Sequence, residues 1–142
     1  MKTDVVYYSA TGNTRKIADV IAKVAGCEAR QAQQDPPVID ADLIFVGGAV
    51  YATSDHNLHP SIRIFADRLK ASGYRGRIVL FATGFKRGDA IGLLRQAFRE
   101  RGFAVEEESF FCKGQLFLFM KGHPNKADLE EAAAFAAKII AS

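Results

Sequence analysis

The sequence predicts an α/β fold, in which a doubly wound parallel sheet of five strands carries helices on both faces. Two observations lead to this prediction. Strand-like and helix-like segments alternate from one end of the chain to the other, and the central apolar runs are continuous, as in strands that are buried on both faces. The 142 residues contain no repeat, linker or low-complexity stretch, so a single domain over residues 1–142 is expected.

The first half of the chain opens with a short apolar strand, expected over Asp4–Tyr8. A helix follows at about Asn13–Ala25, because Ile17, Val20, Ile21 and Val24 recur at helical spacing. The remaining elements of this half are a weak strand, a proline-rich break and a buried strand that ends in two glycines, expected over Cys27–Gln31, Asp35–Pro37 and Leu43–Val46.

The second half repeats the alternation. In chain order, the expected elements are a helix at Pro60–Lys70, a strand at Ile78–Phe81, a helix at Asp89–Arg101, an extended stretch at Phe103–Phe111 and a helix at Lys126–Ala141. Proline in the first turn of the Pro60 helix and Gly102 after the Asp89 helix are typical start and stop signals. Asn125 and Asp128 have the spacing of a cap for the last helix.

Composition and charge exclude several classes of protein. The formal net charge is only +3 and the basic residues are scattered, so nucleic acid is not an expected partner. No apolar run is long enough for a membrane span, and the N-terminus lacks the order of a signal peptide, which favours the cytoplasm. Cys27 and Cys112 lie far apart and are expected to be free, buried thiols, with no metal site.

The stretch YYSATGNT, at residues 7–14, contains the most informative motif. Small and hydroxyl-bearing residues connect the first strand to the first helix at the carboxyl end of the predicted sheet, where ligands of such sheets bind. The stretch lacks the Gly-Lys-Ser/Thr ending of a Walker A motif and the three glycines of a dinucleotide fingerprint. What remains is a helix N-terminus with many hydrogen-bond donors, which suits a phosphate monoester.

This S-x-T-G-N-T motif resembles the phosphate loop of the flavodoxin family, and the order and spacing of elements resemble that family over the whole chain. The resemblance implies the strand order 2-1-3-4-5 and FMN as the cofactor. It also implies that the loop holds the FMN phosphate through Ser9, Ala10, Thr11, Gly12, Asn13 and Thr14.

The loop GGAVYATSDHNLH, at residues 47–59, corresponds to a flavin-binding loop of that family, here Ala49, Val50, Tyr51 and Ala52. Tyr51 stands at the position of an aromatic residue that flanks the isoalloxazine. Ala52 stands where the family has a glycine whose peptide flips to hydrogen-bond flavin N5. Alanine adopts the flipped turn less readily than glycine, which disfavours the semiquinone. We therefore expect behaviour closer to that of a two-electron carrier. His56 and His59 are either exposed and inert or titrate beside the flavin.

The loop ATGFKRGD, at residues 82–89, corresponds to the family segment around the other flavin face. The residues implied to bind FMN there are Thr83, Gly84, Phe85, Gly88 and Asp89. Lys86 and Arg87 replace the acidic cluster that flavodoxins often carry at this point. A redox partner with an acidic or apolar docking surface is therefore expected.

The predicted function is electron transfer between a reductase and an acceptor enzyme, with FMN supplying the chemistry. No nucleophile–base pair or pair of catalytic carboxylates stands out, so no catalytic residue is predicted. The alternative is an FMN-dependent oxidoreductase similar to protoporphyrinogen oxidases or NAD(P)H–quinone oxidoreductases. A receiver domain is disfavoured, because its acidic residues are missing. The apolar stretch at residues 110–124 is either a continued edge strand or a docking or dimer surface.

Overall fold

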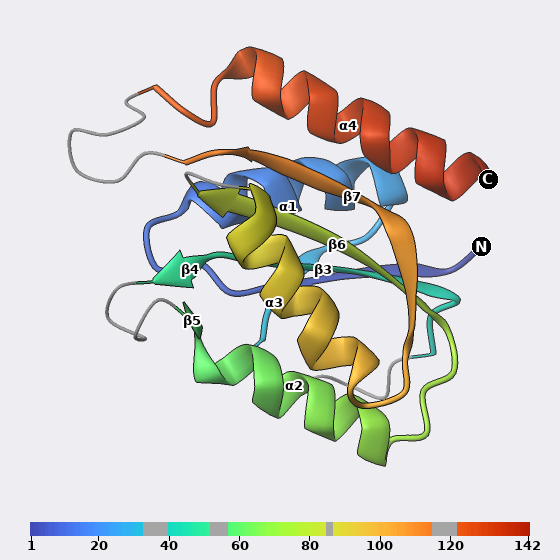
Figure 1. Cartoon of the computed structure of the whole chain (residues 1–142). Coiled ribbons are helices and arrows are strands. Elements are labelled where there is room, and N and C mark those ends of the chain that lie inside the picture. Colours follow the sequence, from blue (N-terminus) through green and yellow to red (C-terminus); the bar gives the residue numbers. More distant parts are fainter. Residues whose placement is uncertain (33–39, 52–56, 85–86, 115–121) are drawn as a thin grey trace.

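The computed structural model describes residues 1–32, 40–51, 57–84, 87–114 and 122–142. Its main sheet has the order β2-β1-β3-β6-β7, with every neighbouring pair parallel. Counted among these five strands alone, the order is 2-1-3-4-5, which confirms the predicted fold (Figure 1). The strands are β1 Thr3–Tyr7, β2 Ala29–Gln31, β3 Leu43–Gly48, β6 Arg77–Gly84 and β7 Ala104–Lys113.

Helices cover both faces of this sheet (Figure 1). Helices α1 (Asn13–Ala25) and α4 (Lys126–Ala141) lie on one face, and α2 (Pro60–Ala71) and α3 (Arg87–Arg99) lie on the other. The bounds agree with the prediction within two residues, and the capping box of Asn125 and Asp128 is present. None of the described helices has the length and apolar character needed to cross a bilayer. The predicted break at residues 35–37 lies outside the described residues.

A small antiparallel hairpin was not predicted. Strands β4 (Val50–Tyr51) and β5 (Asn57–Leu58) pair with each other after β3 and return the chain to α2. Two-residue strands are too short to leave an alternating pattern in the sequence. This hairpin is part of the predicted second flavin loop.

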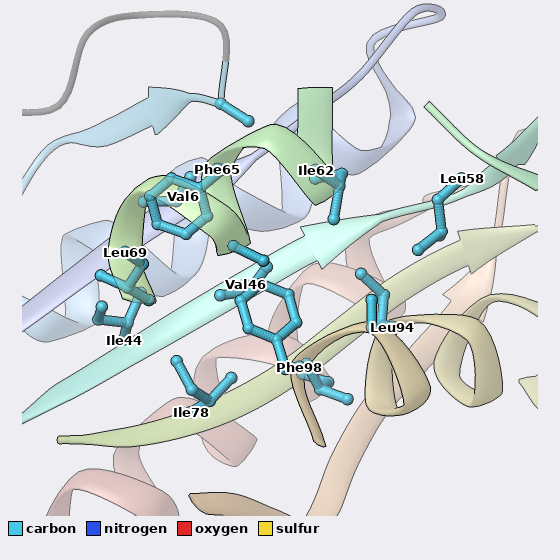
Figure 2. Packing of buried hydrophobic residues seen from close by; sticks show 14 of the residues in the cluster. Val6, Ile44, Val46, Leu58, Ile62, Phe65, Leu69, Ile78, Leu94 and Phe98 are labelled. Carbon is cyan, nitrogen blue, oxygen red and sulfur yellow. The ribbon is translucent and has the colours of Figure 1, made fainter. Parts of the chain in front are cut away.

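The core forms on both faces of the sheet because side chains of the central strands alternate. Along β3, Leu43 and Phe45 pack against α1 and α4, whereas Ile44 and Val46 pack against α2 and α3. Figure 2 shows the second of these cores. The continuous apolar run of β3 is thus explained, as predicted.

Helix α1 differs from the prediction in one respect. Val24 was expected on the buried face but is 40% exposed, and Val20 is half-buried. The buried stripe is completed by Ala18 and Ala22, which contact the sheet beside Ile17 and Ile21. The 3.6-residue period places Val20 and Val24 at the flank of this stripe.

Both cysteines are free, as predicted. Cys112 is buried, whereas Cys27 is only half-buried, which corrects the prediction for that residue. Burial is the main cause that raises the pKa of both thiols, that of Cys112 to about 12.

Candidate functional site

The strands that precede the predicted binding loops end at one edge of the sheet. Because the sheet is parallel, β1, β3, β6 and β7 all end there, with Tyr7 beside Gly47 and Thr83 beside Cys112 in the register. In Figure 1 this edge lies on the left, where the chain leaves β1 for α1 and where β4 follows β3. Such an edge is the usual ligand site of doubly wound sheets.

The loop between β1 and α1 forms an open cradle around the start of the helix. Gly12 is the N-cap of α1 and has a φ of 89°, a conformation that glycine adopts without steric cost. Its N–H donates to Ser9 Oγ at 2.9 Å, and a Cβ built on it would meet no atom within 4 Å. Gly12 has no side chain and the N-cap makes no side-chain hydrogen bond to the helix, so the positive end of α1 is suited to an anion.

Two further residues fix the shape of this loop. Asn13 Nδ2 donates to Thr11 Oγ1 at 3.0 Å. Gly114, directly after β7, lies so close to Asn13 that a Cβ added to Gly114 would be 2.9 Å from Asn13 Nδ2. The Gly114 N–H donates to the Gly84 carbonyl at 3.3 Å, which connects the ends of β6 and β7. Gly114 was not predicted as a site residue; its position after a strand that ends at this edge is the signal that could have identified it.

Thr14 and Thr83 connect the first loop to the third. Their side chains are 1% and 2% exposed, and their hydroxyl oxygens lie 2.8 Å apart. Both were predicted to bind the cofactor, and the structure places them in contact with each other. They lie 69 positions apart in the sequence, so only the sheet brings them together.

The charges around the cradle favour an anion. Residues 8–14 contain no carboxylate, and the first turn of α1 contains no acidic residue. Arg15 and Lys16 in that turn are exposed, and Arg15 Nε lies 3.8 Å from Asp19 Oδ2. A phosphate group would therefore meet the positive end of the helix and no carboxylate of this loop. The hydroxyls, amides and open glycine of this loop fit the phosphate of FMN.

The predicted contacts with the flavin ring lie only partly within the described residues. Ala49 is buried, and Val50 packs on the core beneath the hairpin. Gly84 has a φ of 154° at the end of β6. Ala52, His56, Phe85 and Lys86 lie outside the described residues, and so do the side chains of Tyr51, Arg87 and Asp89. Gly88 lies in the first turn of α3.

His59 has a structural position that the sequence left open. It is the N-cap of α2, where its Nδ1 accepts the Ser61 N–H at 3.2 Å and lies 2.9 Å from Ser61 Oγ. Its ring stacks on Tyr8 with centroids 3.8 Å apart and planes at 12°. The stack joins the start of α2 to the residue before the phosphate loop. Within the described part of the chain, no group of three His, Cys, Asp or Glu side chains could hold a metal ion.

Solved structures with the same fold include flavodoxins and a flavoprotein. A flavodoxin from the domain Archaea matches with a TM-score of 0.76 and 22% identity over 98% of this chain and 96% of its own. Flavodoxin 2 from Bacillus cereus matches with a TM-score of 0.72 and 19% identity over 99% of both chains. A flavoprotein from Lactobacillus acidophilus in complex with FMN matches with a TM-score of 0.60 and 18% identity over 79% of this chain and 92% of its own.

Sequence comparison identifies the family. A search of curated proteins gives no match. The family model described as a flavodoxin domain matches residues 5–118, which include the cradle, the hairpin and the end of β6. This match covers well over half of the chain. The chain therefore belongs to the flavodoxin family.

Proposed function

We propose that this protein carries electrons between a reductase and an acceptor enzyme, with FMN held at the carboxyl edge of the sheet. FMN is the cofactor of the family to which the chain belongs. The observation that supports this function best is the anion cradle at α1, with its positive-φ Gly12 and its uncapped first turn. The cytoplasm, favoured by the sequence, is part of the same proposal.

The chain's own residues bind and orient the cofactor in this proposal. Residues 9–14 hold the phosphate, residues 49–52 and 83–89 surround the ring, and Gly114 keeps Asn13 in place. When it is bound, FMN accepts and donates electrons one or two at a time. The protein shields the ring and sets the charges around it.

Among the described residues, the side chains that could act as nucleophile or base are protonated or hold structural contacts, so the proposed redox chemistry is that of FMN. Burial raises the pKa of the Cys112 thiol to about 12, so this thiol is protonated and a poor nucleophile near neutral pH. His59 is engaged as a helix cap, and His123 Nδ1 lies 2.7 Å from Asp128 Oδ2 beside the cap of α4. Neither arrangement within the described chain forms a nucleophile–base pair.

Cofactor analysis of the purified protein tests this proposal. The protein should be yellow, acid should release FMN and no FAD, and the FMN-depleted protein should quench FMN fluorescence on titration. A colourless protein that quenches no FMN fluorescence would contradict the proposal. Rapid turnover of NAD(P)H with quinones, or of a porphyrinogen, by the protein alone would favour an oxidoreductase over a carrier.

The partner surface is a separate part of the proposal. Lys86 and Arg87 come after β6 in the sequence, and β6 ends at the edge where FMN is expected, so we expect the redox partner to present acidic or apolar groups. Reversal of both charges should slow association with the partner at low salt, and added salt should reduce the difference. An unchanged association rate would remove these two residues from the interface.

A further inference from the structure

The contact between Thr14 and Thr83 joins two loops through uncharged groups. Thr14 is the second residue of α1, and Thr83 is the second-last residue of β6. Their hydroxyl oxygens are 2.8 Å apart, and either can be the donor. Both side chains are almost fully buried, so bulk water does not compete for this hydrogen bond.

The number of hydroxyl hydrogens makes this contact informative. Two hydroxyls carry two hydrogens, but only one hydrogen can lie between the two oxygens. The second hydrogen needs another acceptor, and the described residues offer neither hydroxyl a second hydrogen-bond partner. A buried donor without an acceptor is unfavourable. Within the described residues, the pair therefore has one hydroxyl hydrogen left to donate, and an anion at the start of α1 would accept it.

An anion at the start of α1 would select the direction of this pair. If Thr14 donated to Thr83, the Thr14 oxygen would face the anion with a lone pair. If Thr83 donates to Thr14, the Thr14 hydrogen is free to donate to the anion, which gives a stronger, charge-assisted bond. A hydroxyl that accepts one hydrogen bond also becomes a better donor in the next.

We infer that Thr83 is a positioning residue for phosphate binding: it donates to Thr14 and so holds the Thr14 hydroxyl as a donor to the FMN phosphate. This inference rests on the proposed function, because the anion is the phosphate of FMN. Thr83 lies next to Gly84, whose carbonyl accepts the Gly114 N–H. The end of β6 thereby contributes to the phosphate site without touching the phosphate.

Thr83→Val tests the inference, since valine keeps the shape of threonine and lacks its hydroxyl. Thr83→Ser, which keeps the hydroxyl, is the matched control. The readout is the ratio of FMN affinity to riboflavin affinity, measured by fluorescence quenching, because riboflavin lacks the phosphate. We expect Thr83→Val to lower this ratio by roughly three- to tenfold and Thr83→Ser to leave it within about twofold.

A double-mutant cycle with Thr14→Val separates positioning from direct binding. Once Thr14 has lost its hydroxyl, Thr83→Val should no longer change the ratio. An effect of equal size in that background would show that Thr83 acts without Thr14 and would overturn the inference. Equal losses of FMN and riboflavin affinity in Thr83→Val would also overturn it, since they indicate a structural role only.

The wild-type protein distinguishes failure of the inference from failure of the function. Wild-type protein that binds FMN no better than riboflavin has no phosphate site, and the inference then falls together with the proposed function. If the wild-type protein prefers FMN and Thr83→Val keeps the full preference, only the inference fails. Thr83→Ala, which also lacks the hydroxyl, replaces the valine variant if that variant does not fold.

Discussion

The carboxyl edge of the sheet and the outer flank along β7 hold their polar residues in different ways. At the edge, the contacts join neutral groups: Gly12 to Ser9, Asn13 to Thr11, and Thr14 to Thr83. Along the flank, three consecutive glutamates form ion pairs with basic side chains from three different elements. These pairs are Glu106–Arg77, Glu107–Arg99 and Glu108–Lys138.

The flank also differs in its backbone. Ile78 pairs with Val105 and Leu80 with Ser109, so β7 has two more residues than β6 between these two pairs. The three glutamates lie in this irregular stretch of an edge strand. Charges and irregularities on an edge strand oppose pairing with other chains, while exposed ion pairs contribute little stability.

The comparison shows how charge is distributed for an anionic ligand. A carboxylate in the cradle would repel a phosphate and compete for the same N–H groups, and the sequence has none in residues 8–14. Carboxylates are frequent where no anion is expected to bind. Changes that introduce charge at the edge should thus have large effects, whereas removal of charge from the flank should have small ones.

A carboxylate inside the cradle should have the largest effect. Asn13→Asp keeps the size of the side chain but adds a negative charge. We expect FMN affinity to fall more than about a hundredfold, because two charges about 4 Å apart repel by roughly 4 kcal/mol at an effective dielectric constant of 20. Fluorescence-quenching titration measures this loss. Riboflavin affinity should hardly change, and equal losses for both ligands would contradict the proposed phosphate site.

The same variant should have the opposite effect on the ligand-free protein. An aspartate in the first turn of α1 interacts favourably with the helix dipole, so the free energy of unfolding should rise by about 0.5 kcal/mol. Urea denaturation without FMN measures it. A large destabilisation would mean that the affinity loss reflects damage to the fold.

Loss of one neutral donor from the cradle should have the next largest effect. Thr11→Ala removes the hydroxyl that accepts a hydrogen bond from the Asn13 side-chain amide at 3.0 Å. If this hydroxyl also bonds a charged phosphate, the cost is about 1.5 to 3 kcal/mol, or ten- to a hundredfold in FMN affinity. Thr11→Ser should stay close to wild type. Riboflavin binding that weakens as much as FMN binding would rule out a phosphate contact.

Alkaline pH should destabilise the fold through a buried thiol near the edge, because this thiol loses its proton more readily in the unfolded chain. Cys112, which lies beside Thr83 in the register, has a pKa raised from 9.0 to about 12 by burial and by Asp128 and Glu131. A thiol whose pKa is higher in the folded state stabilises the fold below pH 9 and loses that contribution as the pH rises to 12. We expect a loss of up to about 1.4 kcal/mol per pH unit in this range. Urea denaturation at several pH values should show a flatter dependence in Cys112→Ala, and identical curves would contradict this origin.

The helix cap beside the edge should contribute a moderate amount. His59→Ala removes the Nδ1 acceptor of the Ser61 N–H and the ring that stacks on Tyr8. We expect the free energy of unfolding to fall by about 1 kcal/mol, the usual contribution of an N-cap. His59→Asn retains a good cap and should recover most of the loss. If asparagine is no better than alanine, the stack and not the cap carries the effect.

Removal of a flank ion pair should have the smallest effect. Arg99 and Glu107 are 2.8 Å apart, but their side chains are 45% and 87% exposed. A double-mutant cycle with Arg99→Gln and Glu107→Gln should give a coupling below about 0.5 kcal/mol, and FMN affinity should not change. A coupling above 1 kcal/mol would show that the flank pairs stabilise the fold.

The sequence allowed most of the fold to be predicted. Helices α1 and α4 were predicted with the bounds that the structure has, and the start of α2 was identified from Pro60. The β4–β5 hairpin and the exposure of Val24 were not predicted. Two residues per strand leave no period to detect, and the outer limit of a buried stripe depends on what packs against it.

The sequence by itself determined the alternation of elements, the glycine at the start of α1 and the family, because these depend on residues that are close together in the chain. Only the tertiary structure decided that Gly114 approaches Asn13 and that Thr14 bonds Thr83 across 69 positions. Such contacts depend on strand order and register, which bring the ends of β1, β6 and β7 to one edge. Spacing along the chain does not by itself give the distance between two particular residues on different strands.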